Sequence, residues 1–231
     1  MNEIDAIKER HSVRNYKPDR IPADVVEKIL AKIDELNQAG NLHLQFIEDA
    51  GKTYNKLLNK AMGLGSAPSV IACVGKDAED LDSRVGYFGE KLVLYAQTLG
   101  LNTCWAGTFN RKTIPADIAS DERLVISIAI GYGENQGKPH KSKTPEQVME
   151  IQGESGACPE WFRTGVEMAL LAPTAINQQK FKIRLNEDES VEFIDEGGVL
   201  SQVDIGIIKF HFEIGATYVT DGDGELAKRD S

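Results

Sequence analysis

Two arginines and a serine near the start of the chain have the types and spacing of an anion-binding site. Arg10, Ser12 and Arg14 stand at alternate positions between two predicted helices. A guanidinium group carries a permanent charge and a planar set of donors, and a serine hydroxyl adds one more hydrogen bond. The combination suits a phosphate dianion, although a short motif of this kind, taken alone, is more often a solvated run of charges.

A second candidate ligand-binding segment lies far along the chain. Residues 172–177 read Ala-Pro-Thr-Ala-Ile-Asn and follow a predicted helix. Taken alone, the segment is a turn in which Asn177 bonds to its own backbone. Its alternative interpretation, as one wall of a ligand site, depends on whether it meets residues 10–14 in space.

Other chemistry is disfavoured by the motifs that the sequence lacks. The four histidines are isolated, with no His-Glu-x-x-His, so no metal site is expected. Neither a Gly-x-Ser-x-Gly elbow nor a Gly-x-Gly-x-x-Gly fingerprint occurs. The acidic run 221–225 resembles a calcium loop but has Leu226 where such a loop needs glycine.

Composition predicts a folded protein of the cytoplasm. The 231 residues carry a net charge of −10, are 41% hydrophobic and have a mean hydropathy of −0.31. This charge disfavours nonspecific binding to nucleic acid or to membrane surfaces. No apolar run approaches the roughly 20 residues that span a bilayer, and the N-terminus does not have the pattern of a signal peptide. Three widely spaced cysteines are expected to be reduced thiols.

Hydrophobic periodicity predicts an alternation of helices and strands. In residues 1–150 we expect helices over 2–9, from Pro22 onward, over 54–62 and over 82–99, strands over 42–47, 69–74, 101–105 and 124–130, and a loop over 134–143. Further on we expect a helix over 161–171, a hairpin of strands 181–185 and 191–194, a helix over 203–215 and a flexible tail over 221–231. Both portions repeat the order helix, Ala-x-Asn, alternating strand, Ser-x-Val and apolar helix, which suggests a duplicated and diverged unit.

With these pieces in order, the chain resembles the FMN-dependent nitroreductases. The likeness covers roughly residues 4–150 and, more weakly, 159–217. It rests on Arg-x-Ser-x-Arg at 10–14, Leu-Gly-Leu at 99–101, Cys-Trp-Ala-Gly at 104–107, Ile-Gly-Tyr-Gly at 130–133, Lys-Ser-Lys-Thr-Pro at 141–145, and the Ala-Pro-Thr-Ala-Ile-Asn segment at 172–177.

The resemblance implies an α+β fold with a mixed or antiparallel sheet flanked by helices. Family members are usually homodimers in which one subunit holds the flavin phosphate and the other frames the ring with an Ala-Pro-Ser-x-x-Asn-type loop. Here that loop is missing after the first long helix, at 34–41, and stands instead at 172–177. We therefore expect a fused pseudo-dimer that can exist as a monomer. It would have one composite site, in which residues 1–150 supply the phosphate clamp and residues 159–220 supply the ring loop.

The resemblance also implies roles for individual residues. Arg10, Ser12 and Arg14, with Lys141 and Lys143, would hold the phosphate, and His11 would contact phosphate or ring through its backbone. The ring and ribityl chain would lie against Pro173, Thr174, Ala175 and Asn177. Trp105, Ala106 and Gly107 would pass near the flavin N5, and Gln178 would bond the ring edge or start the next strand. For Lys141 and Lys143, a solvated loop is the alternative.

The implied activity is an FMN-dependent oxidoreductase that needs no catalytic side chain. NAD(P)H would deliver hydride to the flavin N5, and an electron-poor acceptor such as a nitroaromatic, a quinone or an enone would then take it from the same cleft in a ping-pong reaction. Two alternatives remain open at this point: a noncatalytic FMN-binding or flavin-handling protein, and a structural relic without flavin.

Overall fold

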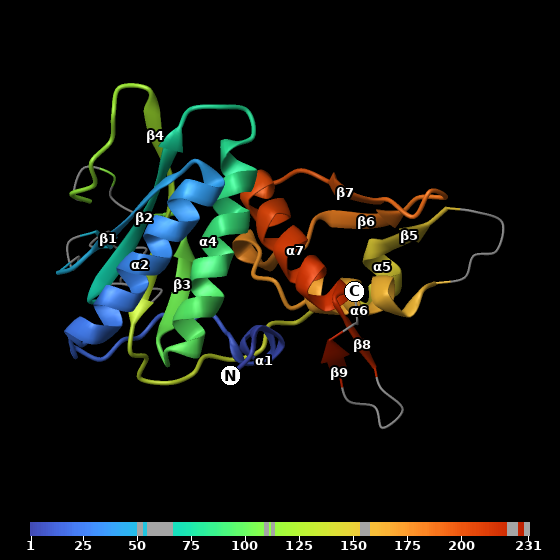
Figure 1. Cartoon of the computed structure of the whole chain (residues 1–231), viewed down its shortest axis with the longest axis horizontal. Coiled ribbons are helices and arrows are strands. Elements are labelled where there is room, and N and C mark those ends of the chain that lie inside the picture. Colours follow the sequence, from blue (N-terminus) through green and yellow to red (C-terminus); the bar gives the residue numbers. More distant parts are fainter. Residues whose placement is uncertain are drawn as a thin grey trace.

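The computed structural model describes residues 1–49, 53–54, 67–108, 111, 114–152, 158–220 and 226–228. The predicted helix over 54–62 lies outside the described residues from 55 onward, as do 221–225 and 229–231 of the predicted tail. Figure 1 shows two groups of strands with helices between and around them.

The larger sheet has the order β1-β2-β4-β3, with every neighbouring pair antiparallel. Its strands are β1 (His43–Ile47), β2 (Ser69–Lys76), β3 (Asn102–Ala106) and β4 (Glu122–Gly131). The central strands β2 and β4 are buried at nearly every position, because both faces of the sheet are covered. In β2, Ile71 and Cys73 join the main core, whereas Val70, Ala72 and Val74 join a second core on the other face.

Two of the described helices pack on this sheet, and a third, shorter helix packs against one of them. They are α1 (Glu3–Glu9), α2 (Ala23–Gly40) and α4 (Leu81–Thr98), and α2 and α4 run across the same face of the sheet in Figure 1. The Asn2 side chain caps α1 by accepting from the Asp5 backbone N–H. The helix α2 ends at Asn41, which takes the left-handed conformation common after a helix, with φ 48°.

The second part of the chain builds a three-stranded sheet of order β5-β6-β7. Its elements are α5 (Pro145–Val148), β5 (Met149–Ile151), α6 (Glu160–Ala169), the 3-10 turn η2 (Ala175–Asn177), β6 (Phe181–Leu185), β7 (Val191–Asp195) and α7 (Ser201–Ala216). The predicted hairpin of β6 and β7 is confirmed, with Ile183 opposite Phe193. The sequence did not predict β5, which pairs parallel to β6.

The last two strands lie between the predicted helix and the predicted tail, and within that tail. The strand β8 (Tyr218–Thr220) pairs antiparallel with β9 (Leu226–Lys228). Figure 1 shows this pair below the end of α7, next to α6. Part of the predicted flexible tail is therefore a strand.

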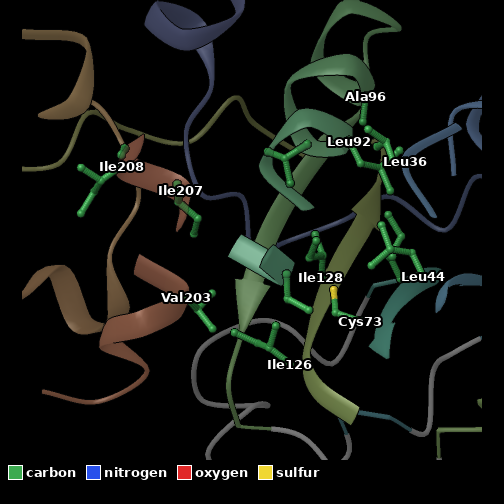
Figure 2. Close-up of a cluster of buried hydrophobic side chains, with 14 of the residues drawn as sticks. Leu36, Leu44, Cys73, Leu92, Ala96, Ile126, Ile128, Val203, Ile207 and Ile208 are labelled. Atoms are coloured by element: carbon green, nitrogen blue, oxygen red, sulfur yellow. The ribbon is translucent and has the colours of Figure 1, made fainter. Parts of the chain in front are cut away.

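The two parts meet where α4 packs against α7. Figure 2 shows one core in which Leu36, Leu44, Cys73, Leu92, Ala96, Ile126 and Ile128 share the region with Val203, Ile207 and Ile208 of α7. The helix backbones touch at Gly86 and Gly206. A Cβ at Gly86 would lie 2.1 Å from the Val203 carbonyl oxygen, and a Cβ at Gly206 would lie 2.0 Å from that of Ser83. Only glycine fits at such a crossing.

Together these elements confirm an α+β fold with largely antiparallel sheets flanked by helices. Within the described ranges, no helix is long and apolar enough to cross a membrane.

Candidate functional site

A cavity of about 640 Å³ brings together the two segments that the sequence singled out. Arg10, His11, Ser12 and Arg14 line one side of it. Pro173, Thr174, Ile176 and Asn177 line another, and a third wall comes from the loop after β4, with Asn135, Gly137, Lys138 and His140. Residues about 160 positions apart therefore line one cavity, and Arg10 also contacts the Leu171 carbonyl, 161 positions away.

The first segment is held against the sheet in an extended conformation. Ser12 forms a parallel bridge with Thr103 of β3, and the Val13 N–H donates to the Thr103 carbonyl at 3.0 Å. Tyr16 bridges Gly133 after β4. Because side chains alternate along an extended chain, Val13 is buried in the core while Ser12 and Arg14 face the cavity.

Arg10 is a buried cation with partners in two distant parts of the chain. Its side chain is 3% exposed, and its Nε lies 3.6 Å from Oε1 of the fully buried Glu90. One guanidinium nitrogen donates weakly to the Leu171 carbonyl at 3.4 Å. Among the described residues, Arg10 Nε has no hydrogen-bond partner. An unsatisfied buried donor is costly, and the adjacent Glu90 carboxylate offsets part of that cost.

Glu90 connects this arginine to β3 and α7. Its Oε2 accepts from the indole N–H of Trp105 at 2.7 Å, and its Oε1 lies 2.9 Å from Nε2 of His211. The other ring nitrogen of His211 lies 3.2 Å from the Met168 carbonyl oxygen. His211 is thus a fully buried core residue with a partner at each ring nitrogen, and no sequence pattern indicated that Glu90 would be buried beside it.

The cavity is electrostatically positive although the chain is acidic. Arg10, Arg14 and Lys138 line it together with His11 and His140, and no described lining residue carries a carboxylate. Burial lowers the pKa of both histidines, and the neighbouring Arg10 charge lowers each further. Such a field suits an anionic ligand.

Gly137 allows the loop after β4 to approach the segment over 10–14 closely. It adopts φ +76°, and a Cβ there would lie 2.8 Å from the His11 Cβ. A larger residue would be strained and would push the loop away from His11. The close approach and the cationic lining both fit a compact anion such as a phosphate group.

The loop after α6 is strained. Ile176, Asn177 and Gln179 all have positive φ, at 49°, 55° and 46°, and the Ile176 side chain is 86% exposed. A β-branched residue in this region is a genuine outlier, and each such residue costs about 1–3 kcal/mol. Strain of this kind persists only where surrounding contacts hold the backbone.

Those contacts come from the loop after β4 and from a glutamine. The Lys141 carbonyl accepts from the Asn177 amide at 3.0 Å and from the Gln179 amide at 2.8 Å. The Lys143 ammonium donates to the Gln179 carbonyl at 2.6 Å, and the Gln179 backbone N–H donates to the Thr174 hydroxyl. The two loops that wall the cavity are thereby fastened to each other.

A buried carboxylate fastens the same loop to α7. Both oxygens of Asp204 accept from the Ala175 backbone N–H, at 2.9 and 3.1 Å, and Oδ2 also accepts from the Gln178 amide at 2.8 Å. Burial raises the pKa of Asp204 to about 6, with a smaller contribution from Asp195, while the two donors oppose the shift.

Replacing Asp204 with asparagine is expected to flatten the dependence of stability on pH. The folded chain holds the Asp204 proton more tightly than the unfolded chain, so wild-type stability should fall as pH rises from 4 to 6. The free energy of unfolding, measured in urea at pH 4 and at pH 6.5, should show a drop about 2 kcal/mol larger in wild type than in Asp204→Asn. The matched control is Asp24→Asn, at an exposed carboxylate; equal drops in all three proteins would contradict the assignment.

Several predicted site residues lie beside the cavity rather than in its wall. Lys141 and Lys143 are not among the lining residues, since the Lys141 backbone and the Lys143 ammonium hold the neighbouring loop. Ala175 and Gln178 bond to Asp204. Trp105, Ala106 and Gly107 lie at the end of β3, which Ser12 joins through Thr103.

Two basic lining residues, Lys138 and His140, were not singled out from the sequence, and neither were Asn15, Asn135 and Gly137. Both basic residues stand in the predicted polar loop over 134–143, and only their proximity to Lys141 and Lys143 could have pointed to them. Within the part of the chain that the structure describes, no cluster of three or more His, Cys, Asp or Glu is placed to hold a metal ion.

Fold and site together define an α+β protein with a composite, cationic cavity. A sequence model of the family described as "Putative TM nitroreductase" matches residues 2–216, so the chain belongs to this nitroreductase family.

Solved structures of nitroreductases have the same fold. A "putative nitroreductase" from Thermotoga maritima is 24% identical, with a TM-score of 0.67 over 98% of this chain and 91% of its own. A nitroreductase-like protein from Streptococcus mutans is 16% identical, with a TM-score of 0.55 over 65% of this chain and 97% of its own. A "putative nitroreductase" in complex with FMN from Desulfovibrio desulfuricans is 18% identical, with a TM-score of 0.52 over 67% and 99%. No curated protein matches the sequence.

Proposed function

We propose that this chain binds FMN in the composite cavity and acts as an NAD(P)H-dependent oxidoreductase. The observation that carries the proposal is the meeting of residues 10–14 and 173–177 in one cationic cavity of a nitroreductase-family fold. One of the similar structures is a complex with FMN. The three cysteines are free, in keeping with a reducing cytoplasm.

The residues present fit the phosphate group of FMN. Arg14 and Ser12 offer donors at the cavity surface, and Arg10 adds a buried positive charge beside them. Lys138 and His140 extend the positive wall, and Gly137 keeps that wall close to His11. The phosphate would therefore lie between the first and third walls.

The loop over 173–177 would hold the flavin ring and ribityl chain. Its strained backbone is fixed by Asp204 and Lys141, so the ring would be oriented without a large ordering cost on binding. Pro173, Thr174 and Asn177 line the cavity, and Ser12 bridges Thr103 in β3, the strand that ends at Ala106.

When bound, FMN would supply the redox chemistry, accepting hydride from NAD(P)H at N5 and passing it to an electron-poor acceptor such as a nitroaromatic, a quinone or an enone. The chain's own residues would bind, orient and set the charge around the ring. None of them is required as a general acid or base.

We also propose that the chain is a fused pseudo-dimer. The order helix, strand, strand, helix occurs twice, as α2-β1-β2-α4 and as α6-β6-β7-α7, and both strand pairs are antiparallel. At the α4–α7 crossing, Gly86 meets the carbonyl three residues before Gly206, and Gly206 meets the carbonyl three residues before Gly86. Reciprocal contacts of this kind are typical of a two-fold axis. Two shorter nitroreductases that match over almost their whole length cover about two thirds of this chain, which supports the same proposal.

The visible absorbance spectrum tests the cofactor assignment. Purified protein, or protein mixed with FMN, should show a flavin spectrum shifted from that of free FMN. Steady-state oxidation of NADH and of NADPH with a quinone acceptor then tests the activity. Binding without turnover would favour a noncatalytic flavin-binding protein, and no binding at saturating FMN would contradict the proposal.

A further inference from the structure

We propose that His140, together with His11, is a protonatable part of the anion site, so that binding of a phosphate monoester dianion takes up a proton from solvent. The inference rests on the proposed FMN site and assigns a role to the loop after β4 that the family resemblance did not. It concerns binding rather than the redox chemistry.

The hydrogen bonds of His140 determine which of its nitrogens can accept a proton. Its Nε2 lies 3.0 Å from the Leu170 carbonyl oxygen, and a carbonyl oxygen can only accept, so Nε2 carries the hydrogen of the neutral ring. The remaining nitrogen, Nδ1, is the position that a further proton would occupy. The Ser142 hydroxyl donates to the same carbonyl at 3.1 Å, which fixes this loop to the end of α6 beside the cavity.

The charges that face the two histidines are mainly positive. Arg10, from the segment after α1, acts on both of them, and His211 of α7 acts on His140. Lys138 lies in the same loop and lines the same cavity. From α4 comes Glu90, whose oxygens already face Arg10, His211 and the Trp105 indole. The residue that follows α6 contributes the Leu170 carbonyl, which is a neutral acceptor.

An anion in the cavity would reverse this balance. With the cavity empty, burial and Arg10 lower the pKa of His140 and of His11, which keeps both rings neutral at neutral pH. A dianion beside them favours their charged forms. The second pKa of the FMN phosphate is about 6, so FMN is already a dianion above pH 7. A proton taken up on binding must therefore go to the protein.

The experiment is a titration of the wild-type protein with FMN between pH 7.0 and 8.5. One unit of pKa corresponds to about a tenfold change in binding, so the Kd of wild type should weaken by about five- to tenfold over this range. Isothermal titration calorimetry at pH 7.5, in buffers of different ionisation enthalpy, should show net proton uptake. Riboflavin, which lacks the phosphate, should show neither effect.

Two variants and one control identify the residues. In His140→Gln the amide can still donate to Leu170 but cannot be protonated, so the pH dependence should shrink to about twofold or less. His11→Gln, which leaves the Leu170 contact intact, should reduce it as well. The matched control is His43→Gln, because His43 pairs with Glu122 at the sheet edge away from the cavity, and its pH dependence should equal that of wild type.

The outcomes separate this inference from the proposed function. FMN binding with no proton uptake in wild type, or with the same pH dependence in wild type and both cavity variants, overturns the histidine assignment and leaves the flavin site standing. Absence of FMN binding at every pH overturns the proposed function itself. If His140→Gln does not fold, His11→Gln and the wild-type calorimetry still decide the question.

Discussion

Replacing Gly206 with valine is expected to lower the free energy of unfolding by at least about 3 kcal/mol, or to prevent folding. A Cβ at this position would lie 2.0 Å from the Ser83 carbonyl oxygen and 2.7 Å from the Tyr87 backbone nitrogen. Both are backbone atoms of α4, so no side chain can rotate away, and the two helices would have to separate. Separation would open the core that α4 shares with Val203 and Ile207.

Urea denaturation followed by circular dichroism would measure this effect. The matched control is Lys209→Val, which places the same residue on the same helix at a half-exposed position and should cost less than about 1 kcal/mol. Gly86→Val should resemble Gly206→Val, because the contact is reciprocal. A Gly206→Val protein as stable as the Lys209→Val control would contradict the close crossing of α4 and α7.

Long periodic segments were predicted well because their pattern is local. The helix expected over 82–99 is α4, at Leu81–Thr98, and the alternating hairpin residues form β6 and β7. The short strand β5 was missed, because three residues carry no periodicity and its partner Ile183 lies 34 positions after Met149. Parallel pairing over such a distance depends on tertiary packing.

Burial within α4 was predicted only in part. A one-sided stripe is expected of a surface helix, yet Glu90, Leu94 and Gln97 are buried as well. The reason is that α4 has the sheet on one side and α7 on another. The charged Glu90 is tolerated there because Arg10, Trp105 and His211 surround it, and none of these contacts is local in sequence.

The candidate site was likewise predicted only in part from the sequence. Residue types at 10–14 and 172–177 were sufficient to predict that these segments carry the chemistry, and the structure places them around one cavity. Which basic residues of the loop after β4 would face that cavity could not be predicted. The position of this loop depends on contacts that are distant in sequence: Asn177 and Gln179 donate to the Lys141 carbonyl, and His140 bonds to the Leu170 carbonyl.

Replacing Arg14 with glutamate is expected to weaken FMN binding by at least about 100-fold while the chain stays folded. Arg14 is exposed at the cavity and contributes no core packing, so its replacement should cost little stability. The change removes charge-assisted hydrogen bonds worth about 1.5–3 kcal/mol each and places a carboxylate beside the phosphate. Titration of flavin fluorescence would measure the Kd.

The control for this experiment separates a local contact from a change in overall charge. Arg20→Glu makes the same change of charge at a side chain that is 82% exposed and does not line the cavity, so it should leave the Kd within about twofold of wild type. Riboflavin adds a second test, because a ligand without the phosphate should bind Arg14→Glu and wild type about equally. Loss of riboflavin and FMN binding together would mean that Arg14 supports the whole cavity, and an unchanged FMN Kd would mean that the phosphate lies elsewhere. The phosphate assignment therefore requires that Arg14→Glu weakens the binding of FMN but not of riboflavin, and that Arg20→Glu weakens neither.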